Sequence, residues 1–135
     1  MMYAGDISPK QAWEFLQSHR DAVLIDVRTE TEWHQDGVPD LSTLARNVSF
    51  ITWDATALNQ PSPFMNHVEK VAQNKLRLVL FLCRSGGRSR SAATLATHHG
   101  YQQAYNIEGG FLGLANTEGN HFPGWKKLGL PWRKK

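Results

Sequence analysis

The chain has 135 residues, of which 41% are hydrophobic and 20% are charged, and a formal net charge of +3 at pH 7. This length predicts one domain over residues 1–135, large enough to bury a core without metal or disulfide support, and a single cysteine excludes an intramolecular disulfide. No segment has the apolar length of a membrane span, and the N-terminus lacks the pattern of a signal peptide. We therefore expect no membrane partner and a cytoplasmic location.

The charge balance indicates which partners to expect. A modest basic excess suits a small anionic substrate, and the last three residues supply as much charge as the whole excess. The sequence has no long basic stripe and no known nucleic-acid-recognition motif, so nucleic-acid binding is not expected. The six histidines lack metal-ligand spacing, and we expect neither a metal nor a cofactor.

The first half of the chain alternates between helical and strand patterns. A helix is predicted to start at Ser8, followed by Pro9 at its first position and Gln11 to complete a capping box. Residues 23–27 form an apolar run typical of a buried strand. A second capping box, from Thr29 to Glu32, predicts a short helix after it.

The second half continues this alternation. The pattern predicts a weak strand within 47–53, a loop over 55–63, a helix opening at Ser62 and Pro63, a strand over 78–82, a helix over 88–99 and a strand over 104–107. Alternating short strands and helices predict an α/β fold with a largely parallel sheet. From about residue 111 the chain is rich in Gly, Asn and Pro, and we expect an irregular tail that wraps over the domain.

The chemistry is predicted at Cys83, the last residue of the apolar run 78–83. The following loop contains two glycines, three arginines and two serines, and a helix begins at its far end. Backbone N–H groups and a positive helix terminus directed at a sulfur favour the thiolate over the thiol.

Two interpretations of Cys83 compete. A lone cysteine often behaves as a small buried hydrophobe. Reactive thiolates instead lie in electropositive, partly exposed loops, and a buried structural thiol needs neither three arginines within seven residues nor two glycines. The sequence therefore favours a functional, partly exposed thiolate.

Asp26 and Arg28 follow another buried strand. In an open parallel sheet, ligands bind beyond the carboxyl ends of the strands, where Cys83 is also expected. Asp26 and Arg28 are either supporting residues of the site or a structural ion pair, and the sequence leaves both interpretations open.

The chain resembles the single-domain rhodanese family of sulfurtransferases. The resemblance extends over nearly the whole chain, with its most specific motif in the active-site loop. It is carried by Asp26-Val27-Arg28, Glu32, Cys83-Arg84-Ser85-Gly86-Gly87-Arg88-Ser89, Asn106-Ile107-Glu108-Gly109-Gly110, Gly124-Trp125 and Gly129-Leu130-Pro131.

This resemblance implies a central five-stranded, mostly parallel sheet with helices on both faces, and a ping-pong reaction. Cys83 would take the sulfane sulfur of thiosulfate or a related persulfide, release sulfite in the case of thiosulfate, and pass the sulfur to a thiol acceptor such as thioredoxin or glutathione. Arg84 and Arg88 would attract the dianionic donor, and the backbone from Ser85 through Gly86 and Gly87 to Ser89 would hold the persulfide.

Alternatives remain at the level of function. The related cysteine phosphatases carry five residues between Cys and Arg, whereas four separate Cys83 from Arg88, and Leu82 stands where phosphatases usually have histidine. A phosphatase or an arsenate reductase is therefore less favoured. A sulfur carrier or a non-catalytic binding module would need the same loop, and departures at Gly37-Val38-Pro39-Asp40 and in the tail leave the donor open.

Overall fold

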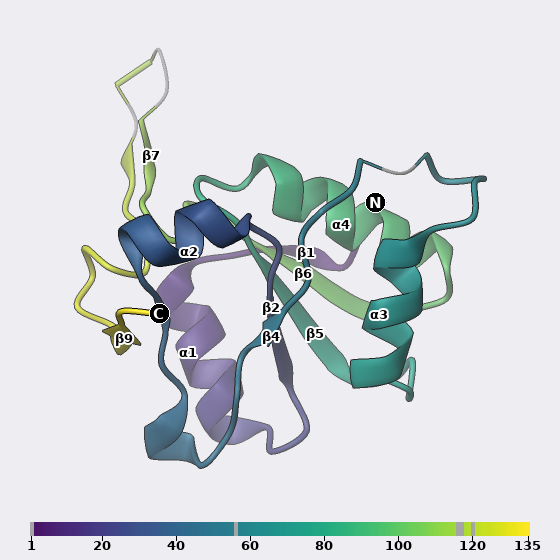
Figure 1. Ribbon diagram of the computed structural model, residues 1–135, viewed down its shortest axis with the longest axis horizontal. Helices are drawn as coiled ribbons and strands as arrows, with labels where there is room; N and C mark the ends of the chain where they lie inside the picture. Colours follow the sequence, from purple (N-terminus) through teal and green to yellow (C-terminus); the bar gives the residue numbers. More distant parts are fainter. Residues whose placement is uncertain (1, 56, 116–117, 120) are drawn as a thin grey trace.

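A computed structural model describes residues 2–55, 57–115, 118–119 and 121–135. Its centre is a five-stranded parallel sheet in the order β1-β6-β5-β2-β4 (Figure 1). The strands are β1 (Gly5–Ile7), β2 (Val23–Asp26), β4 (Ser49–Phe50), β5 (Leu78–Leu82) and β6 (Gln103–Ile107). This confirms the predicted α/β fold and places β5, which leads to Cys83, in the middle of the sheet.

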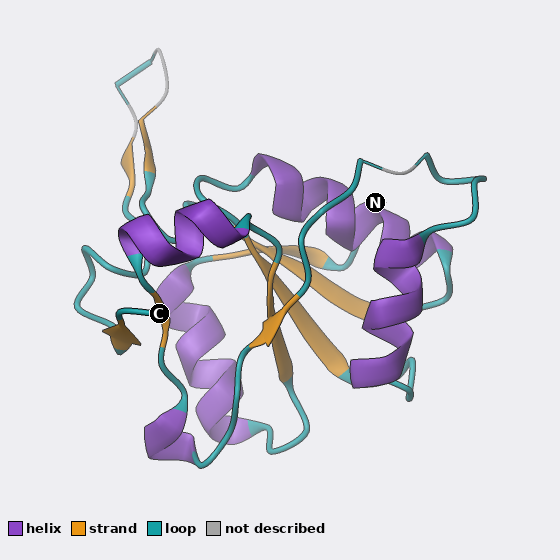
Figure 2. Cartoon of the chain, viewed as in Figure 1, coloured by secondary structure: helices purple, strands orange, loops and turns teal. Residues whose placement is uncertain are grey.

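Helices cover both faces of this sheet, as the resemblance implied. The helices are α1 (Pro9–Ser18), α2 (Glu30–Asp36), α3 (Pro63–Val71) and α4 (Gly87–His98), with a 3₁₀ turn η1 (Ser42–Leu44). Figure 2 shows α1 on one side of the strands and α3 and α4 on the other. Their placement divides the interior into two cores, one against each face of the sheet.

Alternation along the central strands supplies both cores. In β5, Val79 and Phe81 pack with α3 and α4, while Leu80 and Leu82 pack with α1. Successive side chains of a strand point to opposite faces, so a continuous apolar run is what a doubly covered strand requires. All five residues of β5 are buried.

The helix starts follow the predicted caps. At α1 the Ser8 hydroxyl accepts from the backbone of Gln11 at 3.1 Å, and the Gln11 side chain accepts from the backbone of Ser8 at 2.9 Å. Thr29 and Glu32 form the same reciprocal pair at α2. Both capping boxes that the sequence predicted are confirmed.

The remaining strands are two-residue pairs outside the main sheet. β3 (Val38–Pro39) pairs with β9 (Trp132–Arg133), and β7 (Leu114–Ala115) pairs with β8 (His121–Phe122), both antiparallel. The β7–β8 pair extends away from the sheet in Figure 1. The sequence predicted an irregular tail from about residue 111, and this was wrong where β7, β8 and β9 form, since their short pairings leave no periodicity in the sequence. Residues 116, 117 and 120 of that tail lie outside the described residues.

The described residues contain no helix long and apolar enough to cross a membrane.

Candidate active site

Cys83 lies directly after the central strand β5, between the sheet and the first turn of α4. Its Sγ accepts a hydrogen bond from the backbone N–H of Gly86 at 3.1 Å and lies 3.1 Å from the hydroxyl of Ser89. Gly86, the residue that caps α4, has a φ of +119°, which side-chain-bearing residues rarely adopt. The loop therefore brings a backbone donor and the start of a twelve-residue helix to the sulfur.

The first turn of α4 adds further donors. Within the described residues, the backbone N–H groups of Gly87 and Arg88 have no hydrogen-bond acceptor. Unpaired N–H groups at a helix start are suited to an anion. These groups lie in the loop segment that the sequence assigned to anion binding.

The expectation of a partly exposed thiol was wrong. Cys83 is only 1% exposed, whereas its neighbour Arg84 is exposed. The physical reason is the packing around the loop. Ser89 and Asn106 lie behind the sulfur, and the backbone N–H of Phe111 donates to the carbonyl oxygen of Cys83 at 2.8 Å.

The turn that follows β6 also contacts the Cys83 backbone. Leu112 donates to the carbonyl oxygen of Arg84 at 3.0 Å. At Gly110, which has a φ of +58°, an added Cβ would meet the carbonyl oxygen of Cys83. The Glu108-Gly109-Gly110 segment is therefore a close backbone contact for the active-site loop, and only glycine fits at position 110 without a shift.

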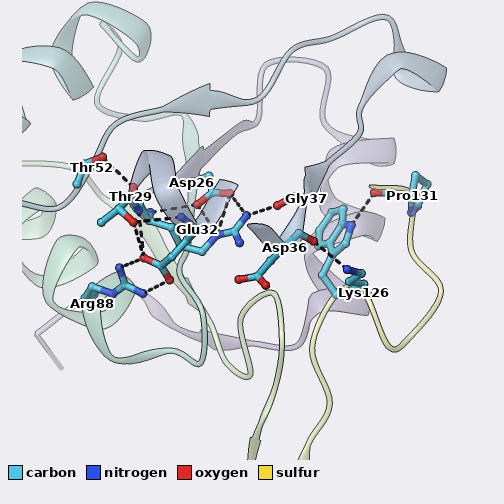
Figure 3. Close-up of polar contacts among 11 residues, drawn as sticks. Asp26, Thr29, Glu32, Asp36, Gly37, Thr52, Arg88, Lys126 and Pro131 are labelled. Atoms are coloured by element: carbon cyan, nitrogen blue, oxygen red, sulfur yellow. Dashed lines mark hydrogen bonds and ion pairs between the residues drawn. The ribbon is translucent and has the colours of Figure 1, made fainter. Parts of the chain in front are cut away.

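Arg88 forms a bidentate ion pair with Glu32 of α2. Its guanidinium nitrogens donate to the two carboxylate oxygens at 2.6 and 2.8 Å, as Figure 3 shows. The hydrogen bonds from Arg88 hold the pKa of Glu32 at about 2, and the same pairing raises the pKa of Arg88. One carboxylate thus caps α2 and fixes Arg88 beside the cysteine loop.

Arg84 differs from Arg88 in its surroundings. It is exposed, and within the described residues its side chain makes no ion pair or hydrogen bond. Ser85 is half-buried and Gly87 is exposed. Arg84 is therefore a positive charge next to Cys83 that no carboxylate of the described chain neutralises.

Asp26 and Arg28 form a fully buried ion pair. The Nη2 atom of Arg28 lies 2.7 Å from Asp26 and donates to the carbonyl oxygen of Gly37 at 2.9 Å, and its guanidinium carbon lies 4.3 Å from the Phe111 ring centroid. These contacts tie the end of β2 to the segment that follows α2 and to the turn against Cys83. Asp26 and Arg28 thus form the structural ion pair that the sequence left open, and within the described residues no hydrogen bond or ion pair joins either of them to the sulfur.

Three contributors to the site were not identified as such from the sequence. Asn106 bonds Ser89, Phe111 anchors the Cys83 backbone, and Glu32, which the sequence marked as a helix cap, also binds Arg88. The available signal for Asn106 was a polar residue between Tyr105 and Ile107 in the predicted strand 104–107. Among the described residues, no group of three or more histidine, cysteine, aspartate or glutamate side chains is placed to hold a metal.

The fold and the cysteine loop define a rhodanese-like protein. The family model described as the STR4 middle domain matches residues 4–135. The chain belongs to this family.

Two relatives match this chain over almost its whole length. The uncharacterized protein RC0915 of Rickettsia conorii is 38% identical over 133 residues, covering 98% of this chain and 99% of its own length. A crystal structure of Rv0390 from M. tuberculosis is 46% identical, with a TM-score of 0.79, and covers 98% of this chain and 99% of that one.

Two more distant relatives carry names that state an activity. The thiosulfate sulfurtransferase GlpE of Haemophilus influenzae is 28% identical over 116 residues, which is 84% of this chain and 90% of the relative. The polysulfide-sulfur transferase homodimer of Wolinella succinogenes is 25% identical with a TM-score of 0.68, covering 96% of this chain and 78% of that one. Both of these names state a transfer of sulfur.

Proposed function

We propose that the protein is a sulfurtransferase that carries sulfane sulfur as a persulfide on Cys83. The observation that supports this most directly is the Cys83 sulfur, which accepts a backbone N–H from Gly86 at the start of α4. A sulfur anion is stabilised by backbone donors and a helix terminus without a counter-ion. The names of two relatives, a thiosulfate sulfurtransferase and a polysulfide-sulfur transferase, are consistent with this reaction.

The reaction is a double displacement. The Cys83 thiolate attacks the outer sulfur of thiosulfate, the S–S bond of thiosulfate breaks, and sulfite leaves with the bonding electron pair. The Cys83 persulfide anion then gives its outer sulfur to the thiolate of an acceptor, which regenerates the Cys83 thiolate and leaves the persulfide on the acceptor. We propose a low-molecular-weight thiol such as glutathione, or a protein thiol such as thioredoxin, as the acceptor in a reducing cytoplasm.

Charge and loop length support the choice of donor. Arg84 offers an unneutralised positive charge to the thiosulfate dianion, and the charge of Arg88 is balanced by Glu32. The four residues between Cys83 and Arg88 form a smaller ring of amides than the five-residue phosphatase loop. A small ring favours a single sulfur atom over a tetrahedral phosphate.

The test is the intact mass of the protein after exposure to thiosulfate, with sulfite release measured in parallel. We expect a gain of one sulfur atom and one equivalent of sulfite. Cys83→Ser is the control and gains nothing. If the wild type also gains nothing from thiosulfate, thiosulfate is not its donor. Sulfur gained only from a persulfide-loaded protein would then favour the carrier function.

A pair of arginine variants tests the role of charge. Arg84→Gln should slow sulfur loading from thiosulfate about tenfold and reduce its sensitivity to salt, because attraction between the dianion and Arg84 is lost. Arg20→Gln removes an exposed arginine of the α1–β2 connection and should leave loading unchanged. Equal rates in the two variants would show that Arg84 does not attract the donor.

A further inference from the structure

A chain of hydrogen bonds runs from the buried sulfur of Cys83 to the protein surface. The Cys83 Sγ lies 3.1 Å from the Ser89 hydroxyl, which donates to the Asn106 Oδ1 at 2.5 Å. The Asn106 Nδ2 donates to the Asp6 carboxylate at 2.8 Å, and the Tyr3 hydroxyl donates to the same carboxylate oxygen at 2.9 Å. Ser89 and Asn106 are fully buried, and Asp6 is exposed.

Strand pairing places the two outer members together. Asp6 of β1 is the direct partner of Asn106 in β6, and directly opposed residues of neighbouring strands share a face of the sheet. The strand register therefore fixes the outer part of this hydrogen-bond chain, which links the surface carboxylate of Asp6 through Asn106 to Ser89 beside the sulfur.

The chemistry of each group fixes the direction of every bond. A carboxylate only accepts hydrogen bonds, so the amide nitrogen of Asn106 must face Asp6 and its amide oxygen must face Ser89. The Ser89 hydroxyl has one proton, and it is committed to that amide oxygen. In the contact between Cys83 and Ser89 the sulfur must then be the donor, which is the arrangement of a neutral thiol.

We propose that Asn106, oriented by Asp6, is a positioning residue that sets the ionisation of Cys83 by competing for the hydroxyl proton of Ser89. When the thiol proton leaves to solvent, the thiolate keeps the backbone N–H of Gly86, and it gains a second hydrogen bond only if the Ser89 hydroxyl turns from Asn106 to the sulfur. The buried Asn106 oxygen then loses its donor, which opposes ionisation. This inference rests on the proposed function, in which the thiolate is the attacking group.

Among the charged groups around this hydrogen-bond chain, only Asp6 is changed in the variants that follow. The charged groups are Arg84 and Arg88 near the sulfur, Glu32 and the Asp26–Arg28 pair beyond them, and Asp6 and Arg90 at the outer end, where Arg90 donates to Tyr3 at 3.2 Å. Glu108 lies near Arg90. Effects of the buried substitutions on ionisation therefore report the hydrogen bonds and not a change of charge.

The experiment measures the ultraviolet absorbance of the thiolate as a function of pH, with Cys83→Ser subtracted. The signal belongs to Cys83 because the chain has one cysteine. Asn106→Leu removes the competing acceptor while filling a similar volume. We expect its midpoint to fall by about one pH unit, a roughly tenfold change in the ionisation constant.

A double-variant cycle separates this role from a general structural one. Ser89→Ala should raise the midpoint, and Ser89→Ala combined with Asn106→Leu should equal Ser89→Ala alone, because Asn106 acts only through Ser89. An unchanged or raised midpoint in Asn106→Leu, or additive shifts in the double variant, would overturn the proposal.

The exposed end of the chain provides a second test that does not disturb the buried core. Asp6→Ala frees Asn106 to turn its amide nitrogen toward Ser89, and it should lower the midpoint. Asp6→Asn also removes the charge but keeps an oxygen acceptor for Asn106, and it should shift the midpoint much less. Equal shifts in the two variants would reject the proposal.

These readouts use no sulfur donor. They therefore keep their meaning if thiosulfate fails to load Cys83, and a failure of the proposed function remains distinguishable from a failure of this inference.

Discussion

At the scale of single residues, the Glu32 carboxylate combines two tasks. It accepts a hydrogen bond from the backbone N–H of Thr29 at the start of α2, and it accepts two more from the guanidinium of Arg88. The hydrogen bonds from Arg88 lower its pKa from 4.5 to about 2, and the backbone of Thr29 adds to the shift. A carboxylate whose pKa is lower in the folded than in the unfolded state stabilises the fold above its unfolded pKa.

Glu32→Gln tests this linkage. Glutamine keeps the capping oxygen and loses the charge, so the variant should lose about 1–2 kcal/mol of unfolding free energy at neutral pH. The wild type should lose that same contribution as the pH falls from 4.5 to about 2, and the variant should show a flatter dependence in this window. Urea unfolding across this pH range measures both effects.

Glu30→Gln is the matched control for that measurement. Glu30 lies in the same first turn of α2, but its side chain is 80% exposed and its partner is His34 at 3.6 Å. Exposed pairs of this kind contribute little. If Glu30→Gln and Glu32→Gln had equal effects, the helix terminus rather than Arg88 would account for the stabilisation.

At the scale of elements, the sequence predicted those structures whose signals are local. The capping boxes at Ser8 and Thr29 lie within four residues, and the apolar run of β5 is continuous. β1 escaped the pattern analysis because three residues, Gly5–Ile7, are too few for a periodicity. Its position depends on pairing with β6, about a hundred residues along the chain.

The residues around Cys83 likewise divide into those with a local sequence signal and those that long-range pairing brings together. The loop from Cys83 to Ser89 was predictable because its residues are contiguous. Asn106 and Asp6 join it only through strand register, and the burial of Cys83 depends on packing against the turn after β6. Long-range packing of this kind leaves no pattern in a single sequence.

The turn after β6 gives a prediction at this scale. Gly110→Ala should destabilise the protein by more than about 2 kcal/mol and raise the alkylation rate of Cys83, because the new Cβ meets the backbone of Cys83 and Arg84 and displaces the turn that buries the sulfur. Thermal unfolding and the rate of alkylation by iodoacetamide are the measurements.

Gly129→Ala is the control for the backbone conformation itself. Its φ is +74°, close to the +58° of Gly110, but an added Cβ meets nothing within 4 Å. Gly129→Ala should lower the free energy of unfolding by only about 1 kcal/mol, the strain of a left-handed backbone, and leave the alkylation rate of Cys83 unchanged. A loss of stability as large as that of Gly110→Ala would show that strain, and not the close contact, makes glycine necessary at 110.

At the scale of the whole molecule, the C-terminal segment connects the turn after β6 to helix α1. The backbone N–H of Trp125 donates to the carbonyl oxygen of Gly110 at 2.9 Å, and its indole N–H donates to Pro131 at 2.7 Å. The Trp125 ring is fully buried and meets Trp13 of α1 edge to face, with centroids 6.0 Å apart. The segment is therefore part of the core on the α1 side of the sheet.

Two tryptophans of this segment allow a direct comparison. Trp125→Ala should lower the unfolding free energy by about 3–5 kcal/mol, because it opens a cavity in the core and frees the turn at Gly110. Trp132 is 38% exposed and lies over the Lys126 ammonium at 3.9 Å, so Trp132→Ala should lower it by only about 1 kcal/mol. Urea unfolding followed by circular dichroism measures both. Similar losses would mean that β9, and not the buried indole, holds the C-terminal segment against the domain.

The alkylation rate of Cys83 shows whether the loosened turn also exposes the sulfur. This rate should rise in Trp125→Ala and stay unchanged in Trp132→Ala, because the contacts that bury Cys83 are made by Gly110 and Phe111.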